Sequence, residues 1–213
     1  MNNHVDPLGL MTGMRVIPTV LEETSRGTKQ WDITSYLLKE HIISFFGEVT
    51  SESVENLMMQ ILWCASNDPK KPIHLYINTP GGEVLSGLAL YETMKSVPNE
   101  IYGYVIGLAA SMGSIIISAC DKRFIGEFGQ VMIHQPSGGC RGRNIDIQVE
   151  AKQIEWCNKQ LVKILALNTG HTIEEIEDFM KNEDKWLDSD AAIEFGICDE
   201  KIKHSKKLYR KEI

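Results

Sequence analysis

Residues 101–120 read IYGYVIGLAASMGSIIISAC, a run without a charged side chain. By hydropathy alone such a run is long enough to cross a membrane, and its glycines include a G-x-x-x-G pair. The run nevertheless carries three glycines and three serines, and its residue composition changes midway. Residues 101–106 have the composition of a strand, 107–110 are small residues typical of a turn, and Ser111 begins a helix. We therefore expect a buried strand, turn and helix of an α/β core.

Strands and helices alternate along the rest of the chain. Further strands are expected at 42–46, 73–77 and 131–133, helices at 32–40, from 50 or 51 to about 66, at 84–95, 146–169 and from 172, and a polar loop at 24–30. This alternation predicts a layered α/β fold with a largely parallel sheet. Residues 1–13 are polar and unpatterned. We interpret them as a flexible leader or propeptide, followed by one domain over 14–213.

Composition excludes several function classes. The 213 residues carry a formal net charge of −7 and show no clustered basic face, so nucleic-acid binding is not expected. The five cysteines form no C-x-x-C pair, which favours a reducing cytoplasm over a disulfide framework or zinc site. No P-loop, H-E-x-x-H motif or signal peptide occurs. We therefore expect a cytoplasmic protein that binds no metal and no cofactor of its own and does not enter the membrane.

Three polar segments could carry chemistry. Ser111 lies among small residues at a strand-to-helix turn, where free N–H groups favour an oxyanion, although a serine helix cap would look the same and G-x-S-x-G is absent. His134 follows the apolar strand 131–133, where an imidazole can take a serine proton or simply bond to backbone. The turn at 78–82, NTPGG, permits close approach of a ligand or merely needs positive φ.

Several short motifs occur in one order along the chain. They are RVIPTV at 15–20, TSRG at 24–27, DI at 32–33, YLLKE at 36–40, YINTPGG at 76–82, YETM at 91–94, GLAASMG at 107–113, MIHQP at 132–136 and LNTG at 167–170. From about residue 15 to 202, that order resembles the proteolytic subunit of the Clp protease. The AASMG and MIHQP motifs are highly specific, and both are intact.

The resemblance implies a crotonase-like α/β fold, with layered sheets, flanking helices and a protruding handle helix, and a serine endopeptidase that cleaves after apolar residues. Ser111 matches the nucleophile, His134 the base and Asp184 the triad acid, while Gly82 and Met112 match the oxyanion-hole residues. The resemblance also implies a self-cleaved leader and two stacked heptameric rings. An AAA+ unfoldase of the ClpX, ClpA or ClpC type would consume ATP and supply unfolded proteins.

The triad acid has two candidates. Counting forward from residues 169–170 with the usual spacing of the family reaches Glu183, whereas counting back from the apolar pair at 186–187 reaches Asp184. We favour Asp184 because the apolar pair should anchor its neighbour more firmly than the polar residues before it. Many relatives carry arginine at the Glu183 position, where it pairs across the ring interface, so Glu183 is expected to affect assembly or little else. The competing interpretation is two surface carboxylates and no triad.

The helix at 146–169 and the preceding loop at 135–143 match the handle by which the two rings interlock. The apolar face of this helix is longer than a single compact domain needs to cover its own sheet. A charge at Ile154 or Leu161 is therefore expected to split or unfold the particle. Thr79 stands where serine is usual in the family.

Two alternatives to a peptidase stay open. A non-catalytic subunit of a mixed ring would share the fold but would not react with a fluorophosphonate. A crotonase-type lyase or isomerase acting on acyl-CoA would also share the fold, yet would have no reason to place Ser111 and His134 in these motifs.

Overall fold

The computed structural model describes residues 18–25 and 27–203. The expected leader at 1–13 lies outside these residues. The chain divides into two compact units, Met1–Glu40 and His41–Ile213, and each is described by itself.

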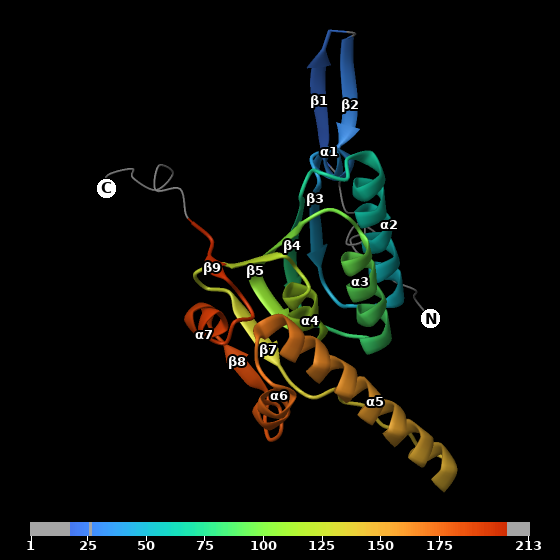
Figure 1. The fold of residues 1–213 in the computed structure, drawn as a ribbon. Helices are drawn as coiled ribbons and strands as arrows, with labels where there is room; N and C mark the ends of the chain where they lie inside the picture. The colour runs from blue at the N-terminus through green and yellow to red at the C-terminus, as the bar shows by residue number, and fades with distance from the viewer. Residues whose placement is uncertain (1–17, 26, 204–213) are drawn as a thin grey trace, which may run out of the picture. The chain divides into compact units, whose positions relative to one another are not determined.

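The first unit contains a hairpin and a short helix (Figure 1). Strands β1 (Thr19–Thr24) and β2 (Gly27–Asp32) pair antiparallel along their whole length, and α1 (Ile33–Lys39) follows. The predicted helix is confirmed, but the polar loop predicted at 24–30 is wrong. This segment has no apolar alternation to reveal a strand, because backbone pairing holds the hairpin while most of its side chains stay exposed.

The second unit is built on a mainly parallel sheet (Figure 1). Its parallel strands follow the order β3 (Ile42–Phe46), β4 (Ile73–Thr79), β5 (Ile101–Ala110), β6 (Lys122–Ile125) and β9 (Glu200–Lys201). Strand β7 (Gln130–Ile133) pairs parallel with β5, and β8 (Lys185–Leu187) pairs antiparallel with β7. The predicted α/β class with a largely parallel sheet is confirmed.

Strand β5 changes partner along its length. Its first half pairs with β6 over Tyr102–Val105, and its last residues, Leu108–Ala110, pair with β7. The turn predicted at 107–110 is therefore wrong, because the strand continues to Ala110. Small residues are needed here for close packing: a Cβ on Gly107 would lie 2.9 Å from Oδ1 of Asn78. The change of partner brings the carboxyl ends of β5 and β7 together.

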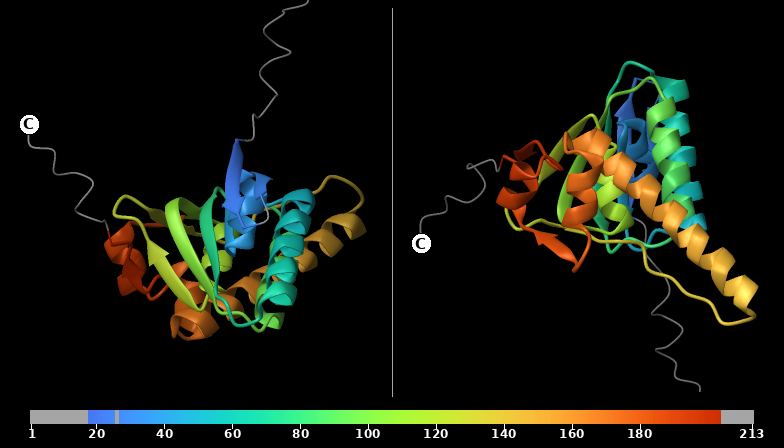
Figure 2. Two further views of the ribbon diagram at one scale, coloured as in Figure 1. Left: turned by 90° about the horizontal axis from the view of Figure 1, so that it is seen from above. Right: turned by 60° about the horizontal axis from the view of Figure 1, so that its bottom comes forward.

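Over the described residues 41–203, six helices pack in this unit (Figures 1 and 2). They are α2 (Ser51–Asn67), α3 (Val84–Ser96), α4 (Met112–Ser118), α5 (Asn144–Thr169), α6 (Ile173–Phe179) and α7 (Ser189–Glu194). All residues of α4 are buried. The C-terminal half of α5 is buried at Leu161 and Leu165, whereas its N-terminal half extends beyond the other elements of this unit (Figure 2). Among the described residues no helix is both long and apolar enough to span a membrane.

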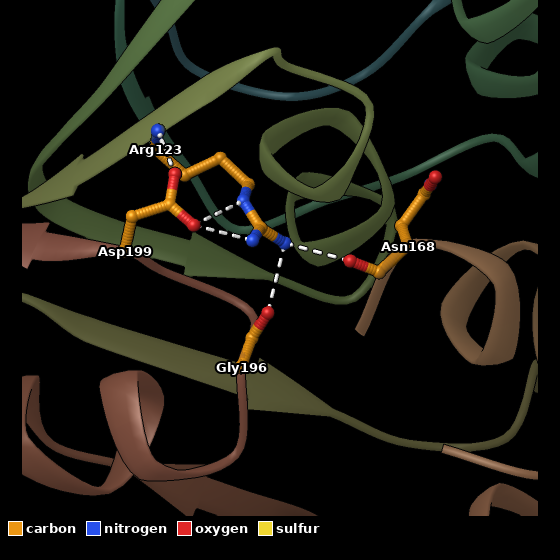
Figure 3. Close-up of polar contacts among 4 residues, drawn as sticks. All are labelled: Arg123, Asn168, Gly196 and Asp199. Carbon is orange, nitrogen blue, oxygen red and sulfur yellow. Dashed lines mark hydrogen bonds and ion pairs between the residues drawn. The ribbon is translucent and has the colours of Figure 1, made fainter. Parts of the chain in front are cut away.

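One arginine connects three parts of the chain that sequence patterns did not relate (Figure 3). The Arg123 backbone N–H and guanidinium both bond to the carboxylate of Asp199. The guanidinium also donates to the carbonyl oxygens of Asn168 and Gly196, each at 2.8 Å. Arg123 therefore holds the end of α5, the turn after α7 and the start of β9 against strand β6, which lies between β5 and β9.

Replacing Arg123 with lysine should lower the melting temperature. A lysine ammonium cannot reproduce the fork to Asp199 and also reach both carbonyl groups, so buried acceptors lose their partner. We expect a loss of about 2 kcal/mol, which corresponds to roughly 4–8 °C for a chain of this size. Differential scanning calorimetry provides the measurement. Arg143→Lys is the control, since that side chain is 81% exposed and should change stability little. Equal melting temperatures for the two variants would contradict this interpretation.

Candidate active site

Ser111 joins β5 to α4 in a strained backbone conformation, with φ 54° and ψ −120°. Its N–H donates to the carbonyl of Met132 at 2.9 Å, and its own carbonyl accepts bonds from the N–H and Oγ of Ser114. The Ser111 side chain makes no capping bond to α4, so the helix-cap interpretation is wrong. Positive φ at a residue other than glycine costs free energy and is concentrated at functional sites. The strain aims the hydroxyl away from the helix that follows.

His134 lies directly beyond β7, beside the serine. Because Ala110 pairs with Met132 across β5 and β7, the two strands end at the same level. His134 Nε2 is 2.8 Å from Oγ of Ser111, which is hydrogen-bonding distance. The interpretation of His134 as a histidine bonded only to the backbone is therefore wrong.

The antiparallel register of β7 and β8 separates the two candidate acids. Ile133 pairs with Lys185, so Asp184 comes opposite His134. Oδ1 of Asp184 lies 3.3 Å from Nδ1 of His134. Glu183 instead bonds to Nζ of Lys185 at 2.6 Å, and this hydrogen bond lowers the pKa of the Glu183 carboxyl. The structure brings Ser111, His134 and Asp184 into one line, and the catalytic role of each remains a proposal.

Two glycines hold the turn after β4 against the serine. A Cβ on Gly81 would lie 2.5 Å from Cβ of Ser111 and 3.0 Å from the Met112 nitrogen. A Cβ on Gly82 would collide with the carbonyl of Val49 at 2.2 Å. Both positions have positive φ, so the pair of glycines is required by the backbone and by the space.

The N–H groups of Gly82 and Met112 could each donate a hydrogen bond to a ligand, for different reasons. The bridge between Val49 and Gly82 uses the Gly81 carbonyl and the N–H of Glu83, so it does not engage the Gly82 N–H. Met112 is the first residue of α4, where an N–H has no acceptor within the helix. The turn that carries Gly82 packs on Ser111 and Met112, since a Cβ on Gly81 would lie 3.0 Å from the Met112 nitrogen.

The thiols of Cys64, Cys120 and Cys198 do not compete as nucleophiles. Burial raises the pKa of the Cys64 thiol to about 11 and that of Cys198 to about 12, and it raises the pKa of Cys120 further. A thiol is a strong nucleophile only as the thiolate. In the described part of the chain, no group of three or more His, Cys, Asp or Glu side chains could hold a metal ion.

A family profile described as Clp protease matches residues 25–205. The chain belongs to the Clp protease family. The resemblance carried by the AASMG and MIHQP motifs is thereby confirmed, and so is the corresponding fold class. Membership indicates a Clp-type peptidase, and proteins of this family generally form oligomeric rings that work with AAA+ partners.

This Clp protease family member also has an apolar pocket lined by residues that follow Gly82 and His134 in the chain, which sequence reasoning missed. The pocket begins at Glu83, directly after Gly82, and at Pro136, two residues after His134. Its volume is about 350 Å³, and its lining residues are Glu83, Val84, Leu85, Pro136, Ser137, Gly138, Glu150, Gln153, Ile154 and Cys157. They come from α3, the loop after β7 and α5, so no contiguous motif could have revealed them.

Proposed function

We propose that this chain is a serine endopeptidase, the proteolytic subunit of an ATP-dependent Clp protease that hydrolyses unfolded polypeptides to short peptides. One observation carries the proposal: Ser111, in a strained turn, lies 2.8 Å from His134, which in turn lies 3.3 Å from Asp184. Catalytic hydrogen bonds are often long before substrate binds, so the second distance suits a resting triad.

The chemistry follows from these positions. The Ser111 hydroxyl transfers its proton to Nε2 of His134 while Oγ attacks the peptide carbonyl carbon. The carbonyl oxygen becomes an oxyanion, and the N–H groups of Gly82 and Met112 stabilise it. His134 then protonates the departing amine, which leaves an acyl-enzyme. Water, deprotonated by His134, attacks the acyl carbon; the bond from that carbon to Oγ of Ser111 then breaks, and His134 returns the proton to Oγ, which releases the acid product and free Ser111. Asp184 stabilises the imidazolium formed in each half-reaction.

The pocket between α3 and α5 supports cleavage after apolar residues. Its surface is mainly apolar, and its lining includes Glu83, which follows Gly82, and Pro136, two residues after His134. Burial of an apolar side chain there would supply about 25 cal/mol for each Å² removed from water. A small number of polar groups at its rim, among them Glu83 and Gln153, would orient the peptide.

We further propose that the subunits form two stacked heptameric rings in the cytoplasm and receive substrate from an AAA+ unfoldase of the ClpX, ClpA or ClpC type. This chain itself would bind neither cofactor nor metal, and ATP would be used by the partner. The support from this chain is the projecting half of α5, where Ile145, Ile147 and Val149 are 56%, 48% and 60% exposed. Apolar side chains gathered on a projecting helix indicate a surface that another subunit covers.

A fluorophosphonate probe tests the proposed activity. It should label Ser111 covalently, as peptide mapping by mass spectrometry would show, and the same preparation should hydrolyse short fluorogenic peptides with an apolar residue before the scissile bond. Failure to label would favour a non-catalytic ring subunit. Labelling without hydrolysis of any peptide would favour a different acyl-transfer reaction on this fold.

Replacing Val149 with glutamate should split the particle. A charge at Ile154 or Leu161 would be less specific, because Ile154 lines the apolar pocket and Leu161 is only 5% exposed within its own chain, where a charge would test folding. An unpaired charge buried at Val149 would cost about 3 kcal/mol or more at each contact. Sedimentation velocity should therefore detect smaller species. Gln148→Glu adds the same charge at an exposed polar position and should leave the particle intact. Unchanged sedimentation of both variants would contradict the proposed interface.

A further inference from the structure

The carboxylate of Asp184 has little to hold it in place. Its side chain is 57% exposed, and among the described residues its only ion-pair or hydrogen-bonding partner is His134. In other serine peptidases the triad acid is buried and tightly held, which sets the tautomer and orientation of the imidazole. Here the position of the carboxylate depends on the backbone of residue 184 and on the residues on either side of it.

The two residues on either side of Asp184, Glu183 and Lys185, form an ion pair with each other. Nζ of Lys185 lies 2.6 Å from Oε1 of Glu183, so the ion pair spans the residue between them. The same ammonium group lies over the ring of Phe179 in α6, 5.6 Å from its centroid. Lys185 is also paired with Ile133 in the β7–β8 ladder, and its side chain is only 28% exposed.

These contacts connect the pair to fixed parts of the fold. The Lys185 backbone is held by β7, and its side chain is held by α6. Glu183 lies in the bend before β8 and is tied to that anchored ammonium. The β7–β8 ladder holds Lys185, the residue after Asp184. The ion pair therefore restrains Glu183, the residue before Asp184, which lies outside the ladder. The carboxylate of Glu183 is thus engaged within its own chain.

We propose that Glu183 and Lys185 form a clip that positions Asp184 against His134. This inference rests on the proposed triad, and it assigns to Glu183 a role in this subunit in place of the expected role in ring assembly. Neither side chain touches substrate, so both are positioning residues. Without the clip, Asp184 spends less time within reach of Nδ1, and the imidazolium formed during each proton transfer loses part of its stabilisation.

Two single variants and their combination test the clip. Glu183→Gln and Lys185→Met should each lower kcat by about two- to fivefold, the range that an exposed ion pair can contribute, with little change in KM. Because both remove the same interaction, the double variant should lose no more than either single one. Exchanging the charges, with Glu183→Lys and Lys185→Glu together, should restore part of the lost kcat, because the ion pair is remade while the contact of the ammonium group with the Phe179 ring is not. Lys203→Met removes an exposed ion pair with Glu200 and serves as the control that keeps wild-type kcat.

The readouts separate a positioning role from a structural one. In the clip variants, the acidic limb of the pH profile of kcat/KM should shift to lower pH, because a less well-placed carboxylate stabilises the imidazolium of His134 less. Losses that multiply in the double variant, no recovery on charge exchange, or an unchanged kcat would overturn the proposal. A loss of kcat that accompanies smaller particles in sedimentation would also overturn it and return Glu183 to the ring interface. If Ser111→Ala retains wild-type hydrolysis, the proposed function fails; if Ser111→Ala is inactive and the clip variants are normal, only the clip fails.

Discussion

Ser111→Ala should reduce peptide hydrolysis by about 10⁴-fold or more while leaving the fold and the particle unchanged. The alanine keeps the small side chain that the crowded turn accepts, with Gly81 packed directly against Cβ. It removes the oxygen that lies 2.8 Å from Nε2 of His134, so neither attack nor an acyl-enzyme is possible. Turnover of a fluorogenic peptide, measured on particles of confirmed size, provides the rate.

Ser66→Ala is a matched control, because its hydroxyl is exposed on α2 and bonds only to the carbonyl of Trp63. It should hydrolyse peptide at the wild-type rate. Substantial turnover in Ser111→Ala would rule out this nucleophile. The same variant should keep the N-terminal residues if the enzyme removes its own leader near 11–14, and normal processing would point to a separate protease.

Asp184→Asn should be the second most damaging substitution, with a loss of kcat of about 10⁴-fold at neutral pH. An asparagine amide can donate to Nδ1 of His134, which would leave the imidazole proton on Nε2. The Nε2 atom could then no longer accept the proton of Ser111, although the distances would hardly change. The imidazolium would also lose the negative charge beside it.

The comparison with Glu183→Gln makes this result specific. Both variants neutralise one carboxylate in adjacent residues, but only Asp184 is within 3.3 Å of the imidazole, while Glu183 is bonded to Lys185. The expected losses therefore differ by roughly three orders of magnitude. A mild effect of Asp184→Asn, or similar losses for the two variants, would show that Asp184 does not act as the triad acid.

The sequence alone was enough to predict the fold class and two members of the site. Apolar runs of strand length, alternating with helical patterns, indicated a parallel α/β sheet, and this signal is local. His134 stands directly after such a run, so its place at a strand end followed from the pattern, whereas Ser111 followed from its motif at the expected start of a helix. Local patterns also misled in two places: small residues at 107–110 were interpreted as a turn, and residues 24–30 of the exposed hairpin as a loop.

Tertiary structure decided whatever depends on residues distant in the chain. Along the sequence, the forward count reached Glu183 and the backward count reached Asp184. Only the pairing of Ile133 with Lys185 put Asp184 opposite the histidine. The apolar pocket likewise combines α3, the loop after β7 and α5. Spacing along a chain cannot fix such positions, because one residue of shift in register moves every side chain to the other face of a strand. Which carboxylate meets the imidazole is therefore set by hydrogen bonds between strands that the sequence does not record.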